Sequence, residues 1–501
     1  MRNAQVNRQV KNVVIAGGGT AGWMAAALLA KTLNKVVNIT LIESEDIGTV
    51  GVGEATIPPL VTYLRLLGIK EQDFMAATQA TFKLGISFEN WRNVDEDYIH
   101  SFGTTGTDHW SAGFQHFWLR DRKRGNTLDY GQYCLELRAA EESRFSHLPK
   151  QGLNYAFHLD ATLFAGFLRE FSEKLGVRRI EGRMVDVEQD PESGYVTRLR
   201  MESGDWVEGD LFIDCTGFRG MLIEQTLHTG YEDWSHWLPC DSAMALQTES
   251  VGPAIPYTRA VAHEAGWRWR IPLQHRVGNG VVFCSRYLDE DRAREILLSQ
   301  VEGTHRGEPR LLRFRTGRRL RNWNKNVVAL GLASGFVEPL ESTSIHLIQR
   351  GMIRLLQLFP YDGIRQSEVD EFNEQSLEEI EHIRDFIVLH YKVTNRNDTP
   401  FWRHCRALSI PDSLAHRIEL FRESGRVFKV GSELFQENSW IQVMIGQGII
   451  PEQYHPAADM LSEEELTRFM ASIRQRVEQT VTRLPQHEAY VGQYCQAKPA
   501  A

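Results

Sequence analysis

The chain has 501 residues, of which 42% are apolar and 24% are charged, and its 65 Asp and Glu outnumber its 56 Lys and Arg, giving a formal net charge of −9. This composition excludes a disordered chain, a collagen-like repeat and a coiled-coil rod, and the negative charge argues against nucleic acid and anionic membranes as partners. The length predicts about three domains or one large two-part enzyme.

The cysteines and the N-terminal residues bear on the location of the protein. Six cysteines lie far apart, with no Cys-x-x-Cys pair and no Cys/His ligand spacing, so we expect reduced thiols and no bound metal. The polar residues 1–12 and the apolar segment after them, which Lys31 interrupts, form neither a signal peptide nor a membrane span. We therefore expect a cytoplasmic protein, either a monomer or a homodimer, that does not bind membranes.

The first predicted unit is strand, turn, helix and strand. A β-branched run at 13–16 predicts a strand, the glycine-rich segment 17–22 a turn, 23–33 a helix, and 37–42 a second strand that ends at Glu43. This order is typical of the first βαβ unit of a dinucleotide-binding fold.

Each glycine of the turn has a separate physical reason. Gly17 permits the tight turn, Gly19 lets the backbone approach a pyrophosphate, and Gly22 lets the helix pack on the strand. The N-terminus of the helix stabilises the anion, and Glu43 accepts hydrogen bonds from ribose hydroxyls. The alternative is a glycine turn that holds no ligand, which this position in the chain disfavours.

Two later stretches continue the same pattern. Residues 158–176 predict a helix, followed by alternating strand-like segments, the last of which ends at Asp214, and 326–331 predicts a strand that leads into a helix at 345–359. Three strands that end in glycine predict one nucleotide fold interrupted by insertions. The fold is expected at 11–55, 152–217 and 326–359, with insertions at 56–151 and 218–325.

From about residue 365 the pattern becomes helical. Ser376 to Glu379 and Ser462 to Glu465 both fit a capping box, so each predicts the start of a helix. The basic run 306–325 is interpreted as a solvated strand face near the phosphates, because no second basic region supports a nucleic-acid site.

Four stretches together resemble the flavin-dependent halogenases of the tryptophan halogenase type. The resemblance extends over nearly the whole chain. The stretch GWRWRIP at 266–272 distinguishes this family from other flavoproteins, many of which share the glycine fingerprint. The four stretches are GGGTAGWM at 17–24, TFKLG at 81–85, GWRWRIP at 266–272 and FVEPLEST at 336–343, with further likeness at 385–392 and 398–402.

The resemblance implies an α/β protein with a glutathione-reductase-like, three-layer FAD-binding domain at 1–364 and a helical module at 365–501 that covers the substrate. It implies that a separate flavin reductase supplies FADH2, which reacts with oxygen to form a C4a-hydroperoxide. Halide, as bromide or chloride, then gives hypohalous acid, which reaches Lys83 and halogenates a small indole-like aromatic. Lys83 would act by hydrogen bonding or as a haloamine, and Glu341 would stabilise the arenium ion and help remove its proton.

The same resemblance assigns the other site residues. His100 and Phe102 would sandwich the indole ring, and the backbone N–H groups of Thr343 and Ser344 would bind halide. Four residues would separate flavin from substrate: Trp267, Trp269, Ile271 and Pro272. The flavin would contact Gly17, Gly19, Thr20, Ala21, Gly22, Glu43, Val50, Gly51, Gly53, Glu54, Gly331 and Pro339, of which those at 47–58 belong to a strap over the cofactor.

Each assignment has an ordinary structural alternative. Lys83 would otherwise be a lysine that extends to solvent, Glu341 a charge at a helix N-terminus, and the two tryptophans plain core residues. At the level of the whole chain, the alternatives are a flavin-dependent aromatic monooxygenase and a non-catalytic flavin-binding protein.

Two departures from the family pattern bear on specificity. Ser344 stands where tryptophan-specific members commonly have glycine, and 439–448 lacks the Tyr pair and Glu that clamp an amino-acid substrate. We therefore predict a substrate other than free tryptophan, halogenation of indole at C3, and a preference for bromide.

Overall fold

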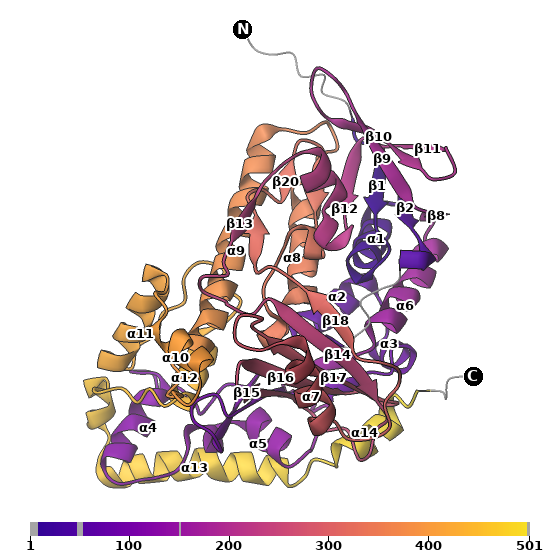
Figure 1. Cartoon of the computed structure of the whole chain (residues 1–501). Coiled ribbons are helices and arrows are strands. Elements are labelled where there is room, and N and C mark those ends of the chain that lie inside the picture. The colour runs from indigo at the N-terminus through magenta and orange to yellow at the C-terminus, as the bar shows by residue number, and fades with distance from the viewer. Residues whose placement is uncertain (1–8, 48–53, 150–151, 498–501) are drawn as a thin grey trace.

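The computed structural model describes residues 9–47, 54–149 and 152–497 (Figure 1). Its upper part contains a six-stranded sheet in which the first strands pair as the βαβ prediction requires, because β1 lies between and parallel to β2 and β12. The strand order is β20 (Trp323–Asn324), β21 (Val327–Ala329), β12 (Leu211–Asp214), β1 (Asn12–Ala16), β2 (Asn38–Glu43) and β8 (Arg178–Glu181).

The alternation of side chains along β1 produces the layers. Val13 and Ile15 are buried on the side of the helix α1 (Thr20–Leu33), whereas Val14 and Ala16 are buried against the opposite layer. The helical side also contains α6 (Ala161–Lys174) and α8 (Ser344–Gln357), and the opposite layer is the antiparallel sheet β9 (Met184–Gln189), β10 (Val196–Met201) and β11 (Trp206–Glu208). The helices, the six-stranded sheet and the antiparallel sheet β9–β11 therefore form three layers, which confirms the predicted three-layer fold.

A seven-stranded sheet unites the two predicted insertions. Its strands are antiparallel neighbours except that β15 pairs in parallel with β5, which comes from the first insertion. The order is β18 (Arg310–Arg313), β14 (Ser242–Thr248), β17 (Val277–Phe283), β16 (Gly266–Pro272), β15 (Thr258–His263), β5 (Gly85–Glu89) and β6 (Asp97–Ser101).

Two small sheets connect these regions. One consists of β3 (Glu54–Ala55), β7 (Ala156–Leu159) and β4 (Thr81–Lys83), and the other of β13 (Tyr231–Asp233), β19 (Gly317–Arg319) and β22 (Gly335–Phe336). Helices between the strands of the first 364 residues are α2 (Pro59–Leu67), α3 (Glu71–Ala77), α4 (Phe114–Lys123), α5 (Leu135–Glu141) and α7 (Glu290–Gln300).

Helices follow from Gln366, as expected. They lie on the left and along the bottom of Figure 1, and many of their buried side chains share one hydrophobic core with the seven-stranded sheet. They are α9 (Gln366–Lys392), α10 (Pro400–Ala407), α11 (Asp412–Ser424), α12 (Glu437–Gly446), α13 (Glu463–Val481) and α14 (His487–Tyr494). No helix in the described part of the chain is long and apolar enough to span a membrane, and all six cysteines are free.

Three sequence predictions need correction. The helix predicted at 158–176 starts only at Ala161, because Asp160 caps it by accepting from the backbone N–H groups of Thr162 and Leu163, and residues 158–159 belong to β7. The capping box at Ser376 is wrong, because α9 runs through it and the Ser376 hydroxyl donates to the carbonyl four residues earlier. The capping box at Ser462 is confirmed.

The third correction concerns the basic run 306–325. Its first strand, β18, lies at the edge of the seven-stranded sheet rather than beside the nucleotide fold. Arg319 is buried and donates to Glu224 at 2.7 Å, so this part of the run is not a solvated face. Alternating side chains predicted the strand but not what covers each face.

Candidate active site

The turn between β1 and α1 has the geometry predicted for a pyrophosphate cradle. Gly17 has a φ of +110°, and a Cβ there would lie 2.3 Å from the carbonyl oxygen of Cys215, so only glycine fits. Gly19 precedes α1 in an extended conformation, and a Cβ on it would meet no atom within 4 Å. The open space at Gly19 faces the start of α1, where Thr20 and Ala21 contribute N–H groups of the first turn.

Two further glycines hold this cradle together. A Cβ on Gly22 would lie 1.8 Å from the Gly17 carbonyl oxygen, so the helix could not pack so close with any other residue. Gly331, with φ +62°, lies so near the turn that its Cβ would be 2.9 Å from that of Ala21. The structure thus brings together two predicted flavin segments that are far apart in sequence.

The two predicted acidic flavin residues differ in their surroundings. Glu43 ends β2, and its carboxylate accepts from the Trp23 indole N–H (3.1 Å) and from Arg179 (2.5 Å). Glu54 in β3 belongs to the predicted strap, and burial raises its pKa to about 7. Val50, Gly51 and Gly53 of the predicted strap lie outside the described residues.

Lys83 is buried at the end of β4. Its Nζ donates to the Thr56 carbonyl oxygen (3.1 Å) and to the Ser342 hydroxyl (2.8 Å), and it lies 5.3 Å from the centroid of the Phe102 ring. Burial lowers the pKa of Lys83 to about 7, against the opposing effect of the Glu341 charge. The alternative of a lysine that extends to solvent is excluded.

Glu341 is equally buried, so it is not an exposed charge at a helix terminus. His100 Nδ1 lies 3.0 Å from both carboxylate oxygens, and His390 Nε2 lies 3.0 Å from Oε1. Burial by itself would raise the pKa of Glu341, but the charges and hydrogen bonds of the two histidines outweigh it and lower the pKa to about 2. The carboxylate is therefore ionised at neutral pH.

The turn after Pro339 connects Lys83, Glu341 and the predicted halide residues. Pro339 begins the short 3-10 turn that ends at Glu341, and Ser342 adopts the left-handed region with φ +60°. Thr343 is buried and occupies the N-cap position of α8 without a side-chain capping bond, and α8 begins at Ser344, so the N–H groups of both residues lie at the unpaired N-terminus of that helix.

The two tryptophans of β16 occupy one face of the strand. Their ring centroids are 6.1 Å apart, and the Trp267 N–H donates to Glu338 Oε2 at 3.0 Å. Ile271 and Pro272 at the end of the strand are buried, and the Pro272 carbonyl accepts from the Thr81 hydroxyl (2.8 Å) in the strand of Lys83. We call Trp267, Trp269, Ile271 and Pro272, which are predicted to separate flavin from substrate, the wall. The bond from Thr81 connects this wall to the strand that carries Lys83.

Comparison with known proteins identifies the family. The family model described as tryptophan halogenase matches residues 12–463. The chain belongs to the tryptophan halogenase family. It is 35% identical to the tryptophan 6-halogenase ThaL of Streptomyces albogriseolus, over 96% of this chain and 98% of that protein.

Two solved structures of flavin-dependent halogenases are similar throughout. Xcc4156 from Xanthomonas campestris superposes with a TM-score of 0.97 at 62% identity, over 99% of this chain and 100% of that one. BrvH from Brevundimonas sp. BAL3 superposes with a TM-score of 0.93 at 43% identity, over 97% and 99%. The predicted fold and class are confirmed: this halogenase is an enzyme of the FAD-binding α/β fold that requires reduced flavin.

Several residues around the halogenase site were not assigned a role from the sequence. His390 lies inside the family-like stretch 385–392, and only its contact with Glu341 reveals its position. Beside His100, Phe386 stacks on Phe435 (centroids 3.8 Å apart) and meets Trp440 edge to face (4.8 Å). These aromatic side chains come from the C-terminal helices and the loop before α12, and no local pattern joins them.

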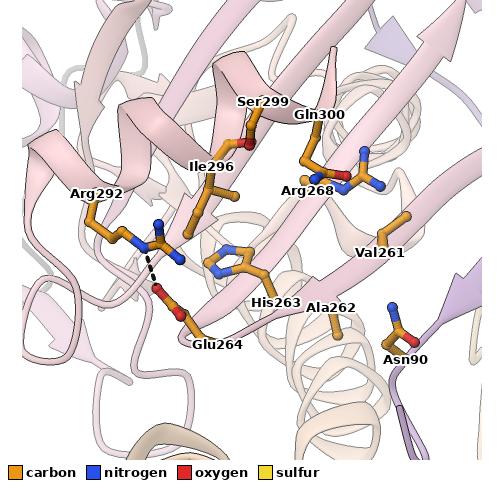
Figure 2. A pocket seen from close by; sticks show the side chains of 10 residues that line it. All are labelled: Asn90, Val261, Ala262, His263, Glu264, Arg268, Arg292, Ile296, Ser299 and Gln300. Atoms are coloured by element: carbon orange, nitrogen blue, oxygen red, sulfur yellow. Dashed lines mark hydrogen bonds and ion pairs between the residues drawn. The ribbon is translucent and has the colours of Figure 1, made fainter. Parts of the chain in front are cut away.

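A surface pocket of about 260 Å³ is separate from this site (Figure 2). It lies on the face of β15 and β16 that bears Arg268, opposite the tryptophans, and α7 forms its other wall. Figure 2 shows Arg292 directed at Glu264, which accepts from it at 2.8 Å. None of the predicted site residues lines the pocket.

Proposed function

We propose that this enzyme halogenates an indole-like aromatic by passing hypohalous acid to Lys83, with Glu341 as the base beside the substrate. The observation that carries the proposal is the bond from the buried Lys83 Nζ to Ser342, the residue next to Glu341. The bond brings together an amine and a carboxylate that are 258 positions apart, in an enclosed site that an electrophile reactive toward water and thiols requires.

The residues at the βαβ turn fit FAD. Gly19 leaves open space at the start of α1, where backbone N–H groups and the helix dipole favour a pyrophosphate. Thr20, Ala21 and Gly331 would hold the pyrophosphate there, Glu43 would accept from the ribose, and Glu54 and Pro339 would contact the flavin. Reduced FAD, supplied by a separate flavin reductase, provides with oxygen the oxidising power that converts halide to hypohalous acid.

Lys83 can act because about half of its amine is uncharged at pH 7. Burial lowers its pKa to about 7, so a large fraction carries a free lone pair. The amine hydrogen-bonds hypohalous acid, or it forms an N–halogen bond while the O–halogen bond breaks, and the departing hydroxide takes one proton from the amine and leaves as water. Phe102 lines this position, 5.3 Å from Nζ.

Glu341 handles the proton of the substrate. When the ring carbon bonds the halogen, the arenium ion carries a positive charge that an ionised carboxylate stabilises. Glu341 then accepts the proton lost from that carbon, and His100 and His390 keep the carboxylate ionised and oriented. His100 and Phe102 hold the aromatic ring, while Trp267, Trp269, Ile271 and Pro272 separate it from the flavin.

The N–H groups of Thr343 and Ser344 bind halide at the start of α8. Bromide is preferred to chloride because it is more easily oxidised and costs less to desolvate. Indole is accepted because α12 offers no Tyr pair to hold an amino-acid end, which leaves the electron-rich C3 free. The helices from 365 onwards form a module distinct in role from the FAD domain at 1–364, because Phe386 and Trp440 cover this side of the site.

One competition experiment tests the proposal. The enzyme is incubated with indole, and in a parallel reaction with free tryptophan, together with FAD, a flavin reductase, NADH, and equal chloride and bromide, and the products are identified by mass spectrometry. We expect 3-bromoindole as the main product. Predominant chlorination would refute the halide preference, faster turnover of free tryptophan at its benzo ring would refute the substrate class, and an oxygenated product without halogen would refute halogenation by this site.

A further inference from the structure

Glu338 is a buried carboxylate with two donors on one oxygen. Its Oε2 accepts from the Trp267 indole N–H (3.0 Å) and from the Tyr391 hydroxyl (2.6 Å). Its Oε1 is buried without a hydrogen-bond partner among the described residues. Burial raises the pKa of Glu338 to about 7, opposed by those two hydrogen bonds.

Burying such a carboxylate lowers the stability of the folded protein. A buried acid without a cationic partner loses hydration that two neutral donors only partly replace, and an apolar residue of the same volume would be easier to bury. No ion pair to Glu338 forms within the described part of the chain. The carboxylate must therefore serve a purpose other than stability.

The two donors come from elements that are far apart in the sequence. Trp267 belongs to the wall strand β16, and Tyr391 belongs to α9, directly after His390, which contacts Glu341. Glu338 itself precedes Glu341 by three residues in the same turn. One carboxylate thus joins the wall, the helix that carries His390, and the turn that carries Glu341.

We propose that Glu338 is a positioning residue for halogenation, because it holds the Trp267 ring in the wall at a defined distance from Glu341 and His390. This inference rests on the proposed function, which makes Trp267 part of the barrier between flavin and substrate. A wall ring that rotates opens a route by which hypohalous acid leaves before it reaches Lys83. Loss of Glu338 therefore lowers the amount of halogenated product formed per FADH2 oxidised, but it does not prevent flavin binding.

Two substitutions separate the hydrogen bond from the side-chain volume. Glu338→Gln keeps an oxygen that accepts from both donors, whereas Glu338→Leu removes the acceptor. The matched control is Glu232→Leu, because the Trp234 indole N–H donates to Glu232 Oε1 at 2.9 Å at a place outside the wall. Each variant is assayed for halogenated indole per FADH2 oxidised, and for hypohalous acid released to a β-diketone scavenger.

We expect Glu338→Leu to lower the yield per FADH2 about tenfold and to raise the scavenger signal, because the Trp267 N–H loses its acceptor and tenfold is about the contribution of one ordinary hydrogen bond. Glu338→Gln should stay within about twofold, and Glu232→Leu should not change the yield. An unchanged yield in Glu338→Leu, or the same loss in Glu232→Leu, would overturn the proposal.

A second measurement does not need turnover. The indole N–H resonance of Trp267, assigned by its absence in Trp267→Phe, should shift in Glu338→Leu and shift less in Glu338→Gln. If Glu338→Leu does not fold, Tyr391→Phe provides the same test, because it leaves one donor and should weaken the hold on Trp267. A resonance that moves in neither variant overturns the positioning role, whereas a wild-type enzyme without halogenated product overturns only the proposed function.

Discussion

Replacing Lys83 by methionine is the most direct test of the site. Methionine has a similar length and suits the buried surroundings, but it can neither hydrogen-bond hypohalous acid nor form a haloamine. We expect Lys83→Met to bind FAD and to lose halogenation. Lys83→Arg should also fail, because a guanidinium stays protonated.

The size of the effect follows from burial. Because the pKa of Lys83 falls from 10.5 to about 7, about three quarters of the amine is neutral at pH 7.5, against about one in a thousand for an ordinary lysine. The rate of halogenation should therefore rise with pH through about 7 and then level off. A rate that falls as pH rises through that value would contradict the role of a neutral amine.

The same pKa shift affects stability. The folded chain binds fewer protons at Lys83 than the unfolded chain between pH 7 and 10.5, so the free energy of unfolding rises with pH across that interval. The contribution is about 1.4 kcal/mol per pH unit and about 5 kcal/mol in total. Below pH 7 the full penalty applies, and above 10.5 it is absent.

Urea unfolding at several pH values measures this contribution. The pH slope of the unfolding free energy should be smaller in Lys83→Met than in the wild type by about 1.4 kcal/mol per unit between pH 7.5 and 9.5. The control is Lys123→Met, because Lys123 also donates to a carbonyl (Glu452, 2.6 Å) and lies over a ring (Tyr454, 5.1 Å) but is exposed. Equal pH slopes in all three proteins would refute the lowered pKa of Lys83. A halogenation rate in Lys83→Met above about a tenth of the wild-type rate would refute the role of Lys83 in the reaction.

Three further predictions concern other parts of the molecule. Gly19→Val should abolish FAD binding in a titration and change the unfolding free energy by less than about 1 kcal/mol, because the added side chain enters open space. His390→Phe removes the nitrogen 3.0 Å from Glu341, so the pKa of Glu341 should rise and the rate should fall more steeply with decreasing pH below 7 than it does in the wild type. Arg276→Met leaves the buried Asp160 carboxylate without the arginine that now donates to it at 2.5 Å, and should lower the unfolding free energy by about 3–5 kcal/mol in urea.

Each of these has a control and a contrary result. Gly166→Val, where a Cβ also meets nothing within 4 Å, should leave FAD binding intact, and a normal titration for Gly19→Val would contradict the cradle. Identical pH–rate profiles for the wild type and His390→Phe would contradict the role of His390 in keeping Glu341 ionised. Arg294→Met breaks an exposed pair with Glu308 and should cost less than about 1 kcal/mol, so an equal loss in both arginine variants would contradict the burial argument.

Local patterns predicted the parts of the molecule whose physics is local. The glycines at 17, 19 and 22 serve one turn and the helix after it, so their spacing was enough to place them. The two tryptophans of β16 share a face because strand side chains alternate, and Ser462 caps α13 because its partner is three residues away. Family resemblance added the chemistry of Lys83 and Glu341, which no spacing implies.

Prediction from local sequence patterns fails where the role of a residue depends on a partner that is distant in the sequence. Ser376 has the pattern of a cap, but α9 continues through it because the neighbouring turns are also helical and the hydroxyl bonds within the helix. His390 and Tyr391 look like the end of an amphipathic helix until Glu341 and Glu338 are placed beside them. A periodic pattern shows that a face is buried, but not against what.

The arrangement of the site was decided by pairing across long sequence separations. β5 joins β15 in parallel, which places the strand next to Lys83 in the same sheet as the tryptophan wall, although the two strands are more than 150 positions apart. Such contacts form because buried apolar faces and backbone hydrogen bonds must find partners somewhere in the chain, and many partners satisfy any one strand. Sequence therefore specified the cofactor turn and the reactive residue types, whereas only the packing of the whole chain brought the amine, the carboxylate and the wall to one place.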